Sequence, residues 1–279
     1  MAQGDATRIR TNIAALNALN ALHKVSNKQQ IHQFRLSTGM RINSAADDPA
    51  GYTIGKKLEA RSRVLGASLN NIGDMKSMLG IAEGGLLNIN DILVTMKEKA
   101  LQAASDTLGS AERYAITLQM EQMNSEIDDI VRETRWNGVQ LIDGTYTAKN
   151  FQTGPDGNDF FSIGISTNHD TTASGLNTAS VDVSSATTAT AALVTLDSAI
   201  ADVSHTLENI GSWVNRLTVK ESTVSIAISN TDAAYSRIFD ADMAKEQLES
   251  TKMQILQQTA TAMLSQANVS SQNILSLFQ

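Results

Sequence analysis

The histidines are the first residues to test for chemistry, because the chain contains no cysteine and therefore no disulfide, thiolate nucleophile or thiolate metal site. Zinc hydrolases place two histidines one helical turn apart, with a glutamate beside the first. The four histidines of this chain do not form that pattern: His23, His32, His169 and His205. The sequence therefore predicts no metal site and no zinc-dependent hydrolysis.

Two further groups could be taken for catalytic motifs. Residues 51–57, Gly-Tyr-Thr-Ile-Gly-Lys-Lys, faintly resemble a phosphate-binding loop, but they lack its spacing and the Ser or Thr that follows the lysine. They are more typical of a helix start. Asp128, Asp129 and Glu133 are most simply the solvated face of a helix rather than an acid/base pair. We expect no enzyme, no catalytic residue and no cofactor.

Composition narrows the class of protein further. The 279 residues are 42% hydrophobic but only 4% aromatic, with two prolines, which suits long helices packed through small and aliphatic side chains. A net charge of −7 gives no basic surface for nucleic acid. No stretch reaches the roughly 18 apolar residues of a membrane span, and the first residues lack the apolar run of a signal peptide. We expect no nucleic-acid partner, no membrane insertion and, if the chain is exported, no cleaved signal peptide.

A seven-residue repeat of apolar residues is the strongest pattern in the chain. It predicts one helix that begins near Pro49, with Asp47 or Asp48 as its N-cap, and continues to residue 103. From residue 58 onward such a helix extends about 68 Å, which implies a rod. The main seam is Leu58, Leu65, Ile72, Leu79, Leu86, Leu93 and Ala100, with Met75, Ala82, Ile89, Met96 and Ala103 beside it.

Other helices are expected around this one. A second should follow the break at 105–109 and fold back on the first, and a third should begin after residue 190. Its register shifts near Phe239, where the last helix begins. Residues 136–165 contain turn dipeptides and predict one small β-hairpin. The Thr, Ser and Ala-rich residues 166–190 predict a variable, exposed linker.

The expected fold is mainly α: a long antiparallel helical coiled coil or bundle, rod-like, with paired terminal helices and one small β-hairpin. The expected parts are 1–45, 46–135, 136–165, 166–190, 191–238 and 239–279.

The apolar stripes at the two ends are too narrow to form a core alone, although burying each Leu or Ile would contribute about 1.5–3 kcal/mol. They need each other and, we expect, other copies of the chain; the alternative is an antiparallel bundle whose stripes are its own core. The residues predicted to form the polymerisation interface are Ile9, Ile13, Leu16, Leu19, Met253, Leu256, Met263, Ile274, Leu277 and Phe278.

Several segments then identify a family. These are Arg8-Ile-Arg-Thr-Asn-Ile-Ala-Ala-Leu16, Leu36-Ser-Thr-Gly-Met-Arg-Ile-Asn-Ser-Ala-Ala-Asp-Asp-Pro-Ala-Gly51, Ala82-Glu-Gly84, Trp136-Asn-Gly-Val139 and Ser271-Gln-Asn-Ile-Leu-Ser-Leu-Phe278. Together they resemble the bacterial flagellins, in order and spacing, over residues 6–165 and 190–279.

The resemblance implies a structural subunit of the flagellar filament, secreted and extracellular, that polymerises with itself and serves swimming motility. Residues 1–45 and 239–279 would form the inner filament core, and 46–135 and 191–238 together with the β-hairpin 136–165 the outer tube. It also implies export of the unfolded chain by the flagellar type III apparatus and partners in an export chaperone, the filament cap and hook-junction proteins. A hook-filament junction protein or a minor flagellin is the alternative.

The segment around Arg41, Asn43, Asp47 and Asp48 connects the two expected layers. One interpretation is a helix terminator at Gly39 followed by the cap of the next helix. The other adds contacts between subunits through Arg41 and the two aspartates. Both interpretations remain open from the sequence.

Three positions depart from the family pattern. In flagellins sensed by the animal innate flagellin receptor, the positions that correspond to Thr95, Lys99 and Gln119 are Arg, Leu and Glu. Losing the charge-assisted contacts and the apolar anchor predicts weak receptor activation or none.

Overall fold

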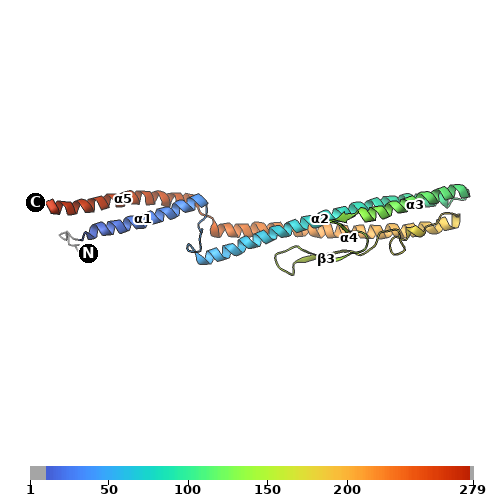
Figure 1. Cartoon of the computed structure of the whole chain (residues 1–279), viewed down its shortest axis with the longest axis horizontal. Helices are drawn as coiled ribbons and strands as arrows, with labels where there is room; N and C mark the ends of the chain where they lie inside the picture. Colours follow the sequence, from blue (N-terminus) through green and yellow to red (C-terminus); the bar gives the residue numbers. More distant parts are fainter. Residues whose placement is uncertain (1–10, 277–279) are drawn as a thin grey trace. The chain divides into compact units, whose positions relative to one another are not determined.

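The computed structural model describes the main chain of residues 11–276 and the side chains of residues 11–269. The described part is mainly helical, as expected, with two small antiparallel hairpins (Figure 1). The helices are α1 Ile13–Thr38, α2 Pro49–Ala103, α3 Ser110–Glu133, α4 Ala186–Phe239 and α5 Met243–Ser276, with a 3-10 turn, η1, at Thr178–Ser180. The strands are β1 Arg135–Trp136, β2 Val139–Gln140, β3 Tyr146–Gln152 and β4 Phe160–Ile165.

The chain divides into two compact units. One contains the chain up to Ala60 together with the chain from Asn230 onward; the other is Arg61–Ser229. The helices α2 and α4 each contribute to both units. No helix among the described residues is long and apolar enough to cross a membrane.

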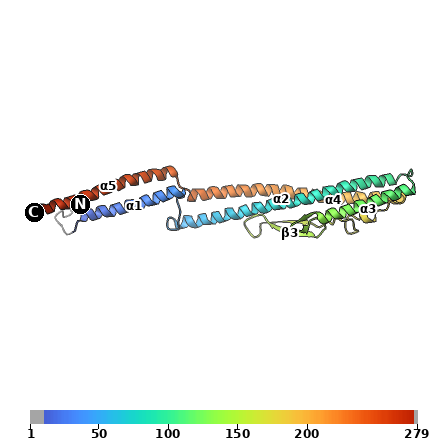
Figure 2. The ribbon, with the colours of Figure 1, turned by 45° about the horizontal axis from the view of Figure 1, so that its top comes forward.

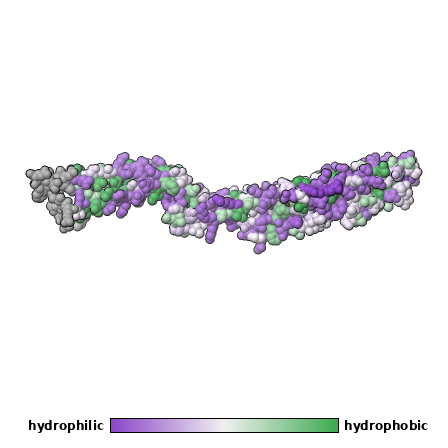
Figure 3. All heavy atoms as spheres, viewed as in Figure 1, coloured by the Kyte–Doolittle hydropathy of each residue, from purple (hydrophilic) through white to green (hydrophobic). Residues whose placement is uncertain are grey.

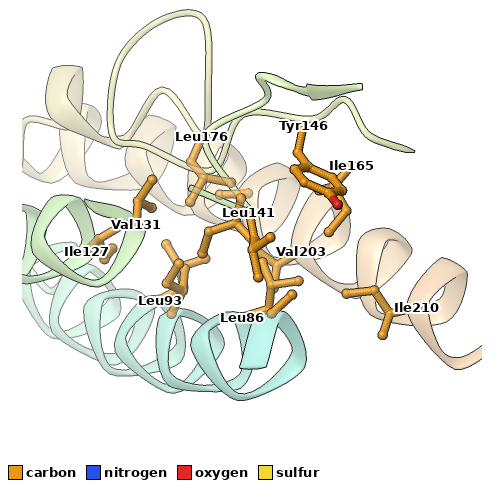
Figure 4. Close-up of a cluster of buried hydrophobic side chains, with 14 of the residues drawn as sticks. Leu86, Leu93, Ile127, Val131, Leu141, Tyr146, Ile165, Leu176, Val203 and Ile210 are labelled. Carbon is orange, nitrogen blue, oxygen red and sulfur yellow. The ribbon is translucent and has the colours of Figure 1, made fainter. Parts of the chain in front are cut away.

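The core of the unit Arg61–Ser229 follows the heptad seam read from the sequence. Along α2 the seam residues Ile72, Leu79 and Leu86 are fully buried. All three belong to one cluster with Val203 and Ile210 of α4 and with Ile127 and Val131 of α3, and Figure 4 shows Leu86 of α2 among these side chains. The helices α2, α3 and α4 lie side by side in both ribbon views (Figures 1 and 2).

Two hairpins lie where one was expected. Asn137 and Gly138 both have positive φ, 49° and 82°, which suits a two-residue turn and closes the β1–β2 hairpin. The longer β3–β4 hairpin is a second unit, with a register irregularity between Tyr146 and Lys149. The sequence contains both turn signals, but two-residue strands carry no periodicity by which to separate them.

Residues 166–190 are less exposed than the sequence suggested. Leu176 and Val183 are buried in the core, and the α3 residue Asp128 accepts hydrogen bonds from the backbone N–H and the hydroxyl of Thr171, both at 2.9 Å. Short Asx turns organise the segment, as where Asp170 accepts from Thr172. Such turns need no apolar repeat, so the pattern on which the linker was predicted could not reveal them.

The unit formed by the chain up to Ala60 and from Asn230 onward contains the terminal helices α1 and α5, which pair antiparallel. Asn12 near the start of α1 donates to the Ala267 carbonyl near the end of α5, and His32 meets Glu246 near the other end of the pair (Figures 1 and 2).

The two breaks between helices lie together in this unit. Gly39, with φ 71°, ends α1 in the left-handed conformation. Its carbonyl accepts from Ala241 N at 2.9 Å, and Arg41 N donates to the Phe239 carbonyl at 2.6 Å. The α1–α2 connection is therefore joined by backbone hydrogen bonds to the α4–α5 connection, with the buried Phe239 ring covering Gly55.

Candidate assembly surface of the terminal helices

The seam between α1 and α5 is made largely of small and polar side chains. At its centre Glu246, 9% exposed, contacts His32 Nδ1 at 2.5 Å and Arg35 at 3.4 Å. A partly buried ion pair adds little net stability, because the cost of removing its charges from water offsets their attraction. The other seam residues include Ala15, Ala18, Leu22, Val25 and Gln29 of α1 and Ser250, Met253, Gln257, Ala260 and Leu264 of α5.

Most of the large apolar side chains of these two helices face away from the seam. None of the residues of α1 is buried, and Leu16 and Phe34 are each 57% exposed. The other exposed apolar residues are Ile13, Leu19 and Ile31 of α1 and Met243, Leu248, Ile255, Leu256, Met263 and Val269 of α5. The surface view shows apolar residues on this part of the chain (Figure 3). Exposed apolar stripes of this length are typical of a surface that a partner covers.

The residues predicted to form the interface divide into three groups. Ile13, Leu16, Leu19, Leu256 and Met263 are exposed. Met253 is 7% exposed and lies inside the α1–α5 seam. Ile9, Leu277, Phe278 and the Ile274 side chain lie outside the described residues.

Sequence reasoning missed Leu248 and Ile255, which are 65% and 59% exposed. The sequence contains a signal for this second apolar stripe, because Leu248 and Ile255 are seven residues apart and lie opposite Glu246 and Met253 on a helix of 3.6 residues per turn. A seven-residue repeat alone does not say which of two stripes faces the partner helix.

The connector residues hold the start of α2 in place. Asp48 Oδ1 accepts from Gly51 N at 3.0 Å and caps α2. Asp47 Oδ2 accepts from the backbone N–H groups of Ser44 and Asn43, and these bonds lower the pKa of the Asp47 carboxyl. Arg41 donates to the Ile238 carbonyl at 2.8 Å.

Asn43 completes this network by donating its side-chain N–H to the Met40 carbonyl at 3.0 Å. Capping and connection are therefore present within one chain, whereas contacts of Arg41 and the aspartates with other subunits remain a prediction.

Comparison with known proteins bears on this arrangement. The family profile of the bacterial flagellin N-terminal helical region matches residues 9–147, and that of the C-terminal helical region matches residues 193–278. The chain belongs to the bacterial flagellin family. Flagellin of Bacillus subtilis strain 168 is 35% identical and covers 98% of this chain and 100% of its own. The flagellar filament 33 kDa core protein of Treponema phagedenis is 31% identical, covering 97% and 99%.

Solved structures agree with this placement. The crystal structure of Bacillus cereus flagellin, 26% identical, covers 60% of this chain and 94% of that one with a TM-score of 0.50. A protein described as a flagellar hook-associated protein of Vibrio parahaemolyticus covers 70% and 100% with a TM-score of 0.58; at 16% identity this likeness concerns the fold alone.

The residues that were first considered as catalytic or metal-binding candidates make contacts within the fold of this flagellin. Asp128 binds Thr171, and Asp129 pairs with Arg132 on the same helix. Residues 51–57 lie in the first turns of α2. His169 is fully buried, and neither ring nitrogen has a hydrogen-bond partner in the described structure.

His169 should make the unit Arg61–Ser229 sensitive to acid. Burial lowers the pKa of His169 from 6.5 to about 4, although the Asp202 carboxylate acts in the opposite direction. The unfolded chain therefore binds the proton more tightly, and stability is lost as the pH falls from about 6.5 to 4. We expect this histidine to remove about 3 kcal/mol from the free energy of unfolding over that range.

The measurement is denaturant unfolding of the wild type and of His169→Leu between pH 7 and pH 4. The difference between the two proteins isolates His169 from the other titrating groups. Parallel pH profiles would contradict the assignment.

Proposed function

We propose that this chain is the structural subunit of a flagellar filament used for swimming, and that it polymerises through its paired terminal helices. The observation that carries the proposal is the outward direction of the apolar side chains of α1 and α5. A subunit with a private core would bury Leu16, Phe34 and Met263, which are instead 57%, 57% and 62% exposed. Full burial of each would contribute about 1.5–3 kcal/mol, which is available only from other copies.

The rest of the proposal follows from family membership. The chain would act outside the cell, in the flagellum, after export in unfolded form by the flagellar type III apparatus. An export chaperone, the filament cap and the hook-junction proteins would be its partners. Flagellar filament core proteins are among relatives that this chain matches over nearly their whole length, which supports a filament role.

The second candidate is a hook-filament junction protein, supported by the fold shared with the Vibrio parahaemolyticus protein. The flagellin relatives at 30–35% identity over nearly the whole chain favour the filament. A minor flagellin of the same filament differs from the main subunit in abundance rather than in chemistry, so quantifying flagellins in purified filaments separates these two roles.

Removing residues 240–279 should abolish polymerisation, because it deletes α5, which is the partner of α1 and also carries exposed apolar residues of its own. We expect full-length protein to form uniform filaments on addition of a precipitating salt, as seen by electron microscopy. The truncated protein should remain soluble and should keep the helical core of the unit Arg61–Ser229 by circular dichroism.

A full-length protein that stays a compact monomer, like the truncation, would oppose the filament proposal. A junction role would then be the better account.

Pure monomer should activate the innate flagellin receptor weakly or not at all. Gln119 is exposed, and Thr95 and Lys99 are half-buried on α2 where the family's sensed members have Arg and Leu. Thr95 carries no charge, and its hydroxyl already donates to the Asp91 carbonyl at 2.9 Å, so it cannot replace the charge-assisted contacts of an arginine. A reporter-cell assay tests this, with the triple substitution Thr95→Arg, Lys99→Leu and Gln119→Glu expected to raise the response. A potent response to the unmodified chain would refute the prediction.

A further inference from the structure

The unit that contains the terminal helices has a hollow on one side. A depression of about 520 Å³ lies between α1 and the connector, and its apolar floor is provided by Ile31 and Phe34. Its remaining lining residues are Asn27, Gln30, Arg35, Asn43, Ser44 and Asp47. Ile31 is 46% exposed and Phe34 57% exposed, so nothing in the described chain fills the hollow.

Two charged residues line the hollow, Arg35 and Asp47, and they differ in whether they can still bind a partner. Arg35 already pairs with Glu246 across the seam. The hydrogen bonds to Asp47 all end on Oδ2, which leaves Oδ1 without a donor among the described residues. These bonds lower the pKa of Asp47, so its carboxylate stays ionised at neutral pH. The hollow therefore fits an apolar ridge that carries a positive charge.

A ridge of that kind lies on α5. Leu248 and Ile255, 65% and 59% exposed, are seven residues apart on one helix face, and the 57% exposed side chain of Lys252 lies between them. The Glu249 carboxylate lies 3.4 Å from the Lys252 ammonium group on the same helix; the Lys252 side chain is 57% exposed and that of Glu249 is 30% exposed. Such a pair contributes little and leaves the ammonium group free to bind another carboxylate.

The hollow and the ridge lie on opposite sides of the paired helices. On α1, Phe34 is about half a turn from His32 and Leu36, which lie on the seam side, and Ile31 is about 100° and 140° from them, so both side chains are directed away from the seam. On α5, Leu248 and Ile255 are likewise opposite Glu246 and Met253. One chain cannot place its ridge in its own hollow, so the occupant must come from a second copy.

We infer that the α5 ridge Leu248–Lys252–Ile255 of one subunit docks in the Ile31–Phe34 hollow of a second subunit, with Lys252 facing the Asp47 carboxylate. This inference rests on the proposed function and names the contact by which the subunits join. The contact is heterologous, because two different surfaces meet. Each bound subunit presents a new free ridge or hollow, and such an interface produces an open helical polymer unless the rotation happens to close a ring.

The absence of cysteine from the chain permits a direct test. Phe34→Cys and Ile255→Cys proteins are prepared separately, mixed, polymerised and treated with a mild oxidant. We expect a disulfide-linked dimer between the two variants to become the main species on a non-reducing gel. The matched control replaces Ile255→Cys with Thr261→Cys, an exposed residue that lines the polar hollow of the same helix, and should give little mixed dimer.

A second measurement does not require cysteine at the contact. Lys252→Glu should slow filament elongation relative to Lys252→Arg, and added salt should reduce the difference because exposed charges are screened. Filaments that form normally without the Phe34–Ile255 disulfide, and without a charge effect at Lys252, would overturn this docking arrangement while leaving the proposed function standing. Failure of the unmodified chain to polymerise would instead oppose the proposed function and the docking arrangement together.

Discussion

Replacing Met253 by aspartate is expected to separate α1 from α5, whereas the same replacement at Met263 leaves the pair intact and stops polymerisation. Met253 is 7% exposed within the seam, and it follows Glu246 by about two turns of α5. A carboxylate there loses the packing of the methionine and is desolvated, at a cost of about 3 kcal/mol or more. Met263 is 62% exposed, so aspartate at this position costs the isolated subunit almost nothing.

Hydrogen exchange of α1 and α5 amides in the monomer measures the first effect, and electron microscopy after salt addition measures the second. Met253→Asp should lose protection in both helices. Met263→Asp should keep wild-type protection but form few filaments. Equal protection in the two variants would show that Met253 does not hold the seam together.

Substituting alanine for glycine should have opposite effects at two positions of α2. A Cβ at Gly55 would overlap the Phe239 ring, which is 2% exposed and stacked on Tyr235 with ring centroids 4.7 Å apart. Displacing this ring should lower the free energy of unfolding by about 1–3 kcal/mol, which outweighs the gain from the higher helix propensity of alanine. A Cβ at Gly73 meets nothing within 4 Å, so Gly73→Ala should stabilise the helix by roughly 1 kcal/mol.

Thermal unfolding of Gly55→Ala, Gly73→Ala and the wild type gives the comparison. Gly55→Ala should also loosen the join between the two helix breaks, because Phe239 supplies the carbonyl that binds Arg41 N. If both alanines stabilise the protein, the Phe239 ring has room to move and the close approach at Gly55 is not a constraint.

The long helices could be predicted from the sequence because their apolar repeat is long and keeps its phase, even where Glu221 and Thr231 replace apolar residues in α4. Pro49 preceded by Asp48 marked the start of α2, and the structure places the first residue and its cap there. The register shift near Phe239 marked the end of α4 at that residue. At these two positions the local signal, a helix cap or a register shift, coincides with a boundary of the apolar repeat.

The sequence was less informative where hydrogen bonds rather than apolar repeats decide the structure. The burial of Leu176 and Val183 depends on turns made by Asp and Thr side chains, which composition alone presents as a polar linker. The orientation of α5 was ambiguous for a different reason. Its two stripes, one through Met253 and one through Ile255, are similarly apolar, and the structure shows which one faces α1: Glu246 meets His32, and Met253 is buried while Ile255 is exposed.

The mainly small and polar seam of the terminal helices has a kinetic consequence. A pair held by one ion-pair cluster and a few apolar contacts opens more readily in a free subunit than the unit Arg61–Ser229, which has a continuous apolar core. In the proposed assembly, its exposed apolar side chains gain most of their burial when the subunit meets an existing polymer end. Starting a new filament therefore requires several weakly ordered subunits to order one another at once, whereas adding a subunit to an end requires only one. A protein built in this way favours a few long filaments over many short ones.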